Sequence, residues 1–349
     1  MASAGVIGWF EALGLADRAA VGGKGGSLGE LTRAGIAVPP GFVVKTTAFE
    51  NFLRVLEHAT PVRERVRALS AGDLGKITQV SGELRARFES TELPPDMAAE
   101  LTDAHARLCE RAGAADVAVR SSATTEDASD ASFAGLQDTF LWVGDAARML
   151  NRVRACWASL YSVESISYRL DRGIDEQQVA MAVVVQSMVN ARAAGVMFTR
   201  SPTTGDRSVL TIEGAWGLGS AVVGGEVTPD RWVVGKITGE ISVREISDKH
   251  VEHRRARDGG VESVAISDER RRAPCLSDAE LGELRQIARH VERHYGCAQD
   301  IEWAIDTRGA LRLLQSRPET VWSSREVRPA ARAADDPLSH VMSIFGGRR

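Results

Sequence analysis

The sequence has few cysteines and no long apolar run, and each shortage excludes a class of protein. Its four cysteines, among 349 residues, are widely spaced and form no Cys-x-x-Cys pair, which argues against a disulfide framework or a cysteine zinc site. Nowhere do 18 apolar residues follow one another, and the N-terminus has no basic segment followed by an apolar one. We therefore expect a cytoplasmic protein with reduced thiols and no membrane partner.

Charge of one sign is not in excess either. The chain has 43 lysine and arginine residues against 47 aspartate and glutamate residues, a net charge of −4. Without a basic field the sequence gives no reason to expect binding of nucleic acid. Its 26% charged and 44% apolar residues are typical of a soluble globular protein, and its length suggests two or three lobes.

The stretch VAVRSSATTEDASDASFAGLQDTFL, residues 117–141, is the densest group of candidate ligand-binding residues. Apolar residues 117–119 predict a short buried strand, which leads Arg120 into a loop of small hydroxyl and acidic residues. Small residues let backbone N–H groups approach an anion, and an arginine offers paired donors to phosphate oxygens. On composition alone, an exposed serine-rich turn with one surface ion pair is the alternative.

A second candidate is the segment GGKGGSLGEL, residues 22–31. Its Lys24 lies between two glycine pairs, ahead of a helix that we expect to start near Ser27 and to end at Gly35. Glycines beside a helix N-terminus let the backbone and a lysine approach phosphate. The spacing is not that of a Walker loop, so a flexible turn is the alternative for this motif alone.

Residues 300–322 predict a β-hairpin whose turn is Asp306-Thr-Arg-Gly. With a two-residue loop, 307–308, one face of the hairpin collects Glu302, Leu313, Gln315 and Arg317. Carboxylate and amide oxygens suit Mg²⁺, and an arginine beside them suits phosphate. An odd loop would separate Glu302 from the other residues, and the argument would then fail.

These motifs resemble, in the same order, the blocks of one known domain. The string RSSATTEDASDASFAGLQDTFL is similar to the signature of the nucleotide-binding domain shared by phosphoenolpyruvate synthase, pyruvate phosphate dikinase and rifampicin phosphotransferase. The likeness continues in GGKGGSLGEL, IAVPPGFVV, GVMFTRSP, EGAWGLGSAVVGGEVTPDRWVV and DIEWAIDTRGALRLLQSRPETVW. It implies an α+β protein of the ATP-grasp fold. The expected parts are an N-terminal lobe or lobes over 1–190, a C-terminal lobe over 191–322 and a linker or tail over 323–349.

The resemblance also assigns roles to residues at matching positions. Those implied to bind ATP are Lys24, Arg120, Gly135, Thr139, Gln186, Met188, Val189, Glu213, Gln315 and Arg317. Catalysis is expected to depend on Lys24, Arg120 and Arg317, which would hold the phosphates. Mg²⁺ is expected on Glu302 and Gln315. The expected cofactors are therefore ATP and Mg²⁺.

Some of these assignments have plainer alternatives. Backbone groups at the end of the predicted strand 179–189 are expected to read the adenine edge, but the segment is a core strand in either case. Glu213 is expected to end a strand and to position the ribose or nucleotide, and Trp216 after it is either a ligand contact or a loop anchor. His250 and His253 have a spacing seen in metal sites, but their charged surroundings favour a solvated surface.

In long members of the resembling family, the ATP-grasp domain is accompanied by a domain with a phosphorylated histidine and by one that binds the acceptor. None of the seven histidines here has the matching Gly-Gly-rich, His-Ala context. We therefore expect the ATP-binding subunit of a split dikinase-type phosphotransferase, as in phenylphosphate synthase. It would (pyro)phosphorylate a histidine of a partner subunit, with release of AMP and phosphate. The partner would bind the small-molecule acceptor, such as a phenol, a cresol or pyruvate.

Three alternatives stay open at this point. The sequence is also compatible with an ATP-binding fragment of a longer phosphoenolpyruvate synthase or rifampicin phosphotransferase. A stand-alone kinase that phosphorylates a small molecule directly would turn over ATP without a partner. A non-catalytic nucleotide-sensing subunit is disfavoured, because it would have little need of the metal pair Glu302 and Gln315.

Overall fold

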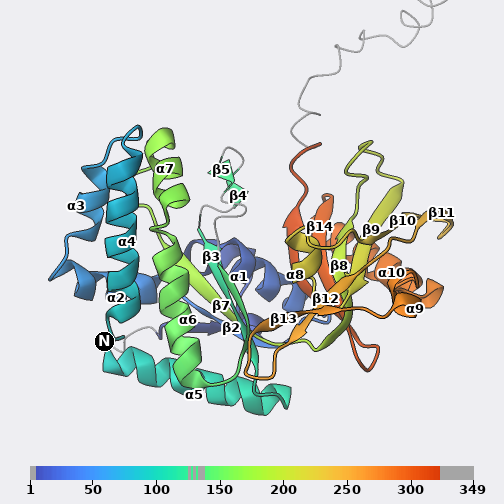
Figure 1. Ribbon diagram of the computed structural model, residues 1–349, viewed down its shortest axis with the longest axis horizontal. Coiled ribbons are helices and arrows are strands. Elements are labelled where there is room, and N and C mark those ends of the chain that lie inside the picture. Colours follow the sequence, from blue (N-terminus) through green and yellow to red (C-terminus); the bar gives the residue numbers. More distant parts are fainter. Residues whose placement is uncertain (1–4, 125–126, 129–130, 133–137, 323–349) are drawn as a thin grey trace, which may run out of the picture.

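Two lobes lie side by side, and each is built around an antiparallel β-sheet (Figure 1). The computed structural model describes residues 5–124, 127–128, 131–132 and 138–322. Both lobes combine helices with antiparallel strands, which confirms the predicted α+β class. In sequence, the first sheet ends at residue 187 and the second begins at residue 191.

The first lobe has a five-stranded sheet with helices on both faces. Its strands pair in the order β1 (Ile7–Trp9), β2 (Gly41–Val44), β7 (Met181–Ser187), β3 (Val117–Ala123) and β6 (Thr139–Val143). One face packs against α2 (Thr46–Glu57), α3 (Val62–Arg67), α4 (Leu74–Ser90), α5 (Pro95–Ala112), α6 (Ala146–Ser159) and α7 (Val163–Arg172). The other face packs against α1 (Arg18–Arg33). Short elements are η1 (Phe10–Ala12), η2 (Leu15–Asp17), β4 (Asp127–Ala128) and β5 (Ala131–Ser132).

The second lobe has a six-stranded sheet covered on one face by helix α10 (Asp278–Tyr295). Its strands pair in the order β11 (Ile241–Glu245), β10 (Asp230–Gly235), β9 (Val209–Trp216), β8 (Ala191–Phe198), β14 (Gln299–Asp306) and β15 (Leu311–Pro318). The covered face buries Trp232 and Trp303, and the other face is turned toward the first lobe. Smaller elements are the hairpin β12 (Val251–Arg255) and β13 (Val261–Ala265), α8 (Ser220–Val223) and α9 (Asp268–Arg271).

Helix α1 joins the two lobes. The sequence predicted a helix starting near Ser27, but α1 begins well before that residue and is broken only at Gly22, whose φ is 70°. A Cβ at Gly22 would lie 2.2 Å from the carbonyl oxygen of Ser122, so this close contact with β3 requires glycine. Beyond the break, Ser27 Oγ donates to the carbonyl oxygen of Ser316 at 2.5 Å, and Leu31 enters the core of the second lobe.

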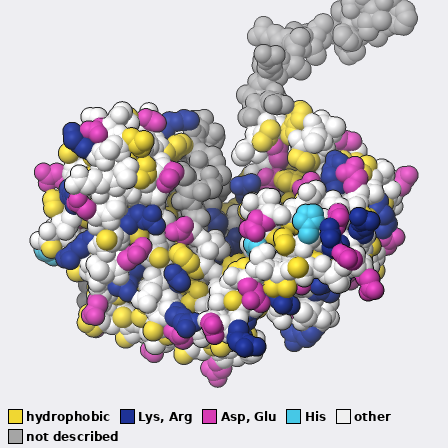
Figure 2. Space-filling view, viewed as in Figure 1, with side chains coloured by type: hydrophobic (Ala, Val, Ile, Leu, Met, Phe, Trp, Pro, Cys, Tyr) yellow, Lys and Arg dark blue, Asp and Glu magenta, His cyan; other side chains and the backbone are white. Residues whose placement is uncertain are grey.

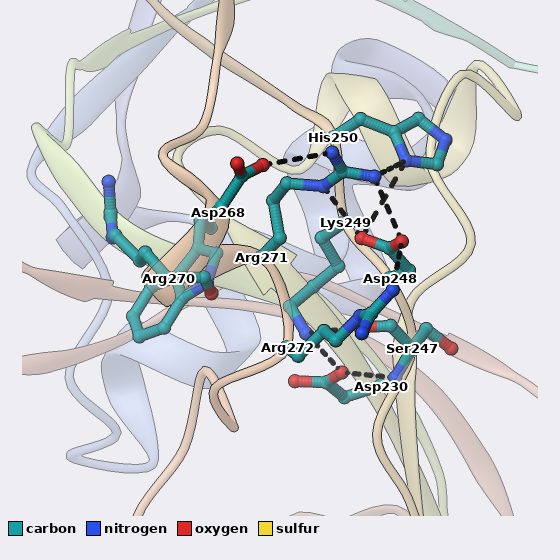
Figure 3. Close-up of polar contacts among 10 residues, drawn as sticks. Asp230, Ser247, Asp248, Lys249, His250, Asp268, Arg270, Arg271 and Arg272 are labelled. Atoms are coloured by element: carbon teal, nitrogen blue, oxygen red, sulfur yellow. Dashed lines mark hydrogen bonds and ion pairs between the residues drawn. The ribbon is translucent and has the colours of Figure 1, made fainter.

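A buried ion pair anchors the chain where β11 leads into the β12–β13 hairpin (Figure 3). Asp230 and Lys249 have fully buried side chains, and Lys249 Nζ lies 2.5 Å from Asp230 Oδ1. The same oxygen accepts the amide hydrogen of Ser247 at 2.9 Å. Closer to the surface, Arg271 binds both carboxylate oxygens of Asp248, at 2.7 and 2.8 Å. The start of the hairpin is thus fixed on β10 and α9.

The molecular surface agrees with the even charge balance of the sequence. On the face drawn in Figure 2, basic and acidic side chains mix over both lobes and form no large patch of one sign. Among the residues that the structure describes, none of the helices combines the length and the apolar character needed to cross a bilayer.

Replacing Lys249 by methionine is expected to lower the free energy of unfolding by about 3–5 kcal/mol, because Asp230 would stay buried without its charge partner. Urea denaturation followed by circular dichroism measures this loss. Lys76→Met is the control, since the Lys76 side chain is 74% exposed and its removal should leave the midpoint unchanged. An unchanged midpoint in Lys249→Met would show that the pair does not anchor the hairpin.

Candidate functional site

A cavity of ≈ 210 Å³ lies between the two sheets. Its wall in the first lobe consists of Ala118, Arg120, Thr139, Leu141, Gln186, Ser187, Met188 and Val189. Its wall in the second lobe consists of Ala191, Ala194, Gly195, Leu218, Gly219, Ser220, Val223, Glu302, Trp303, Ala304 and Leu314. Pockets for drug-sized ligands usually measure roughly 300–1,000 Å³, so this cavity suits one flat group of a larger ligand.

The cavity brings together predicted residues from four separate segments of the sequence. Those that line it are Arg120, Thr139, Gln186, Met188, Val189 and Glu302. Gln315 does not line it but bonds to Arg120 at its edge. Lys24, Glu213 and Arg317 lie outside its walls, and Gly135 lies outside the described residues.

Arg120 connects the two lobes at the edge of the cavity. Strand β3 continues past Arg120, so the prediction that it ends at Val119 is wrong. The guanidinium donates to the carbonyl oxygen of Leu314 at 2.8 Å, to Glu302 Oε2 at 2.8 Å and to Gln315 Oε1 at 2.9 Å. Because the Arg120 side chain is only 10% exposed, these bonds act at reduced solvent screening.

Glu302 and Gln315 share one face of the hairpin, as predicted, but for a different reason. The hairpin loop contains three residues, 307–309, so the predicted two-residue loop is wrong. A β-bulge at Leu314 adds one residue to β15, so Glu302 pairs with Gln315 and the two side chains lie on the same face. Leu313 lies before the bulge and therefore faces the core, not the side shared with Glu302 as predicted.

Asp300 is a site residue that reasoning from the sequence missed. It lies opposite Arg317 and two residues before Glu302, so all three share the face turned to the first lobe. Arg317 Nε lies 3.5 Å from Asp300 Oδ2, whereas Oδ1 is buried without a hydrogen-bond partner within the described residues. Burial raises the pKa of Asp300, and the charge of Arg317 opposes this rise. The two-residue spacing from Glu302 was the signal that could have identified it.

Lys24 lies in the first turn after the break in α1, beside strand β3. Ser122 of β3 holds this turn, since its Oγ donates to the carbonyl oxygen of Val21 at 2.9 Å and accepts the amide hydrogen of Gly25 at 3.2 Å. The backbone amides at the start of a helix and its dipole favour an anion there. The structure thus brings Lys24 next to the strand that carries Arg120, and its phosphate contact stays a prediction.

The end of β7 forms the wall where adenine was expected. Gln186 is 2% exposed, and its side-chain amide donates to the carbonyl oxygen of Pro39 at 3.2 Å. The amide of Met188 donates to the carbonyl oxygen of Asp116 at 3.0 Å. The amide of Val189 has no protein partner in the described part of the chain, which leaves it for a ligand. A base would therefore form hydrogen bonds with the main chain here, because the side-chain amide of Gln186 already donates to Pro39.

The prediction that Glu213 ends a strand is wrong, because β9 continues to Trp216. Val196 pairs with both Glu213 and Glu302, so the two acids lie two strands apart on the same face of the sheet. At the usual strand spacing this separation is roughly 10 Å. The nearest opposite charge of Glu213 is Arg231 on β10, 4.0 Å away. A role for Glu213 in positioning the nucleotide stays a prediction.

The expected solvated surface around His250 and His253 is correct for the first residue and wrong for the second. His250 is exposed as predicted, with 62% of its side chain accessible, but His253 is only 8% exposed. The reason is that β12 runs under the glycine-rich segment that follows β9, where His253 bonds to Ser220 and Glu226. Over the residues that the structure describes, no three histidine, cysteine or acidic side chains cluster closely enough to hold a metal ion.

Comparison with known proteins identifies the family to which this chain belongs. Residues 18–336 match the family model described as the pyruvate phosphate dikinase AMP/ATP-binding domain. The chain belongs to this family. The resemblance inferred from the sequence blocks and the ATP-grasp type of fold are thereby confirmed.

Relatives of the dikinase family are substantially longer than this chain. It is 44% identical over 316 residues to the probable phosphoenolpyruvate synthase of Methanothermobacter thermautotrophicus, covering 90% of this chain and 46% of that protein. It is 42% identical over 311 residues to a rifampicin phosphotransferase from a Streptomyces species, covering 89% and 35%. It is 37% identical over 362 residues to the phosphoenolpyruvate synthase of Aeropyrum pernix, covering 95% and 44%. The chain spans less than half the length of each of these relatives.

A dikinase-type ATP-binding domain has to balance the charge of a polyphosphate. Lys24, Arg120 and Arg317 supply positive charge on the two sides of the gap between the lobes. Glu302 bonds to Arg120 through one carboxylate oxygen, so the other oxygen has no partner within the described residues. A carboxylate and an amide oxygen are ligands that Mg²⁺ accepts beside phosphate and water, so Glu302 and Gln315 fit this ion.

Replacing Arg317 by glutamine is expected to raise the pKa of Asp300 further above its usual value of 3.8, because Arg317 is the charge that opposes the effect of burial. Carbon-13 NMR of aspartate carboxyl groups measures the titration, and Asp300→Asn identifies the signal. Because the pKa of Asp300 is higher in the folded than in the unfolded protein, its protonated form stabilises the fold. This contribution to the free energy of unfolding is complete at a pH below the unfolded-state pKa and is lost as the pH rises through the folded-state pKa. An unchanged or lower Asp300 pKa in Arg317→Gln would contradict the assigned coupling.

Proposed function

We propose that this chain is the ATP-binding catalytic module of a dikinase-type phosphotransferase that binds Mg-ATP. A histidine nitrogen of a phosphocarrier partner attacks the β-phosphorus, the bond from that phosphorus to the α–β bridging oxygen breaks, and AMP leaves with the oxygen. Water then attacks the terminal phosphorus of the pyrophosphoryl-histidine, the P–O–P bond breaks and phosphate leaves, and the histidine passes the remaining phosphoryl group to a small-molecule acceptor. The acceptor is a phenol, a cresol or pyruvate, bound by the partner.

The observation that carries this proposal is the convergence of Arg120, Glu302 and Gln315 from opposite lobes at the edge of one cavity. The main chain at residues 188–189 offers a base-binding wall at the other side of that cavity. A nucleotide that spans the two would bury its base and present its phosphates to the cations. Phosphoryl transfer requires mainly such alignment and charge balance, and little covalent chemistry by the protein.

Each charged residue has a definite task in this proposal. Lys24 and Arg120 bind phosphate oxygens from the first lobe, and Arg317 binds them from the second. Glu302 and Gln315 hold Mg²⁺, which when bound neutralises charge on the phosphates. Asp300 lies beside Arg317 and orients its guanidinium. Glu302 and Arg120 separate partly as the phosphates bind, since Arg120 then exchanges a carboxylate for a phosphate oxygen.

The proposal that the histidine comes from a partner has support from the positions of the histidines in this chain. Six of the seven lie in the described residues: His58, His105, His250, His253, His290 and His294. None of these six lines the cavity. His253 bonds to Ser220, which lines the cavity, but both of its ring nitrogens are already bonded.

Replacing Arg317 by alanine is expected to lower phosphoryl transfer by about 10²–10³-fold, the usual loss when one preorganised charge-stabilising donor is removed. The assay is Mg²⁺-dependent release of AMP from ATP with the phosphocarrier present. Arg244→Ala is the matched control, because Arg244 is on the same sheet but opposite Trp232, on the face that packs against α10. Transfer at the wild-type rate in Arg317→Ala would refute the phosphate role of Arg317.

The proposed function as a whole is tested by measuring AMP release with and without the protein encoded beside this one. Phenol, cresol and pyruvate are offered in turn as acceptors. The proposal predicts AMP only when the partner is present, and stoichiometric phosphorylation of one acceptor. Release of ADP or AMP by this chain alone would contradict it and would favour a stand-alone kinase.

A further inference from the structure

Strand β12 runs beneath the glycine-rich segment, residues 217–225, that forms one side of the cavity. The amide of Leu218 donates to the carbonyl oxygen of His253 at 2.9 Å. A Cβ at Gly217 would lie 2.4 Å from the same oxygen, and the φ of Gly217 is 74°, so this approach requires glycine. Ser220, in the same segment, lines the cavity. The position of Ser220 therefore depends on β12.

The side chain of His253 fixes the hydroxyl group of Ser220. Its Nδ1 lies 2.9 Å from Ser220 Oγ, and its Nε2 lies 3.0 Å from Glu226 Oε2. A carboxylate can only accept, so Nε2 carries a hydrogen; in the neutral ring Nδ1 then accepts, and Ser220 donates. This direction leaves the lone pairs of Ser220 Oγ available to a donor in the cavity.

The same strand also reaches the opposite wall of the cavity. Arg255 Nη2 lies 3.0 Å from Asp116 Oδ1, and the guanidinium lies 5.5 Å from the ring centre of Trp142. The carbonyl oxygen of Asp116 in turn accepts the amide hydrogen of Met188. Strand β12 thus holds the glycine-rich segment through one side chain and the proposed base-binding wall through another. It sets the spacing between them.

We infer that Ser220 accepts a hydrogen bond from a ribose hydroxyl of the bound nucleotide, and that His253 is the positioning residue that orients it. The inference rests on the proposed ATP site. With the base at Val189 and the phosphates at Arg120, the ribose lies between them and faces Ser220 across the cavity. Ribose hydroxyls can donate to the lone pairs that His253 leaves free. A site built to bond a hydroxyl rejects the analogue that lacks it.

The test is calorimetric titration with ATP, 2′-deoxy-ATP and 3′-deoxy-ATP in the presence of Mg²⁺. The wild type is expected to bind ATP about 3- to 10-fold more tightly than one of the two deoxy analogues, the usual effect of one hydrogen bond. Ser220→Ala should weaken ATP binding by the same factor and abolish the difference. Ser220→Thr retains the hydroxyl and should preserve it.

The role of His253 is tested by two variants with the same readout. His253→Gln cannot keep both ring contacts, so discrimination between ATP and the analogue should fall. Glu226 is half exposed, and Glu226→Ala removes the acceptor that keeps the hydrogen on Nε2, so the ring is free to carry it on Nδ1 and Ser220 then accepts. It should reduce discrimination without disturbing the core. Ser263→Ala, at an exposed position opposite His253 on β13, is the control and should behave like the wild type.

Equal binding of all three nucleotides by the wild type would overturn the ribose contact, as would an equal loss for all three in Ser220→Ala. Full discrimination in both His253→Gln and Glu226→Ala would overturn the positioning role of His253. Failure of the wild type to bind any of the three nucleotides would instead refute the proposed function on which the inference rests.

Discussion

The structure depends on one buried cation that is shared by two sheets. Arg120 extends from β3 of the first sheet, and within the described residues its hydrogen-bond acceptors belong to the hairpin of the second. A buried guanidinium is stable only when acceptors replace its lost hydration. Those acceptors are not complete, since Arg120 Nε has no partner within the described residues. An anion bound at the junction between the lobes would therefore accept a hydrogen bond from Arg120 Nε.

The cavity beside Arg120 exists because the inner face of the second sheet has small residues at that point. Ala194 and Ala304 lie on its floor. Gly195, next to Ala194, pairs with Trp303, and a Cβ there would lie 1.9 Å from the carbonyl oxygen of Glu213, so β8 and β9 come close together at this point. Further along the same face, the small residues give way to the charged pair Asp300 and Arg317. One sheet face thus offers an apolar floor and then a polar edge, as a base with attached phosphates requires.

Much of this arrangement could be predicted from the sequence because it rests on local signals. The apolar strands and the sequence blocks that resemble the family are local signals, and they led to the fold and to Arg120, Glu302 and Gln315. The β-bulge at Leu314 could not be predicted, since its position depends on pairing with β14. The burial of His253 also depends on a contact between segments that are distant in sequence. It arises because β12 passes beneath the glycine-rich segment, residues 217–225.

Hydrogen exchange of backbone amides, with and without Mg-ATP, tests most directly whether the cavity between the lobes is the nucleotide site. The account predicts that ATP slows exchange in β3, at the end of β7 and in residues 217–223, which surround the cavity. It also predicts that Arg120→Gln loses this protection at the same ATP concentration. Binding of ATP that protects only segments remote from these, or equal protection in Arg120→Gln, would contradict the central claim.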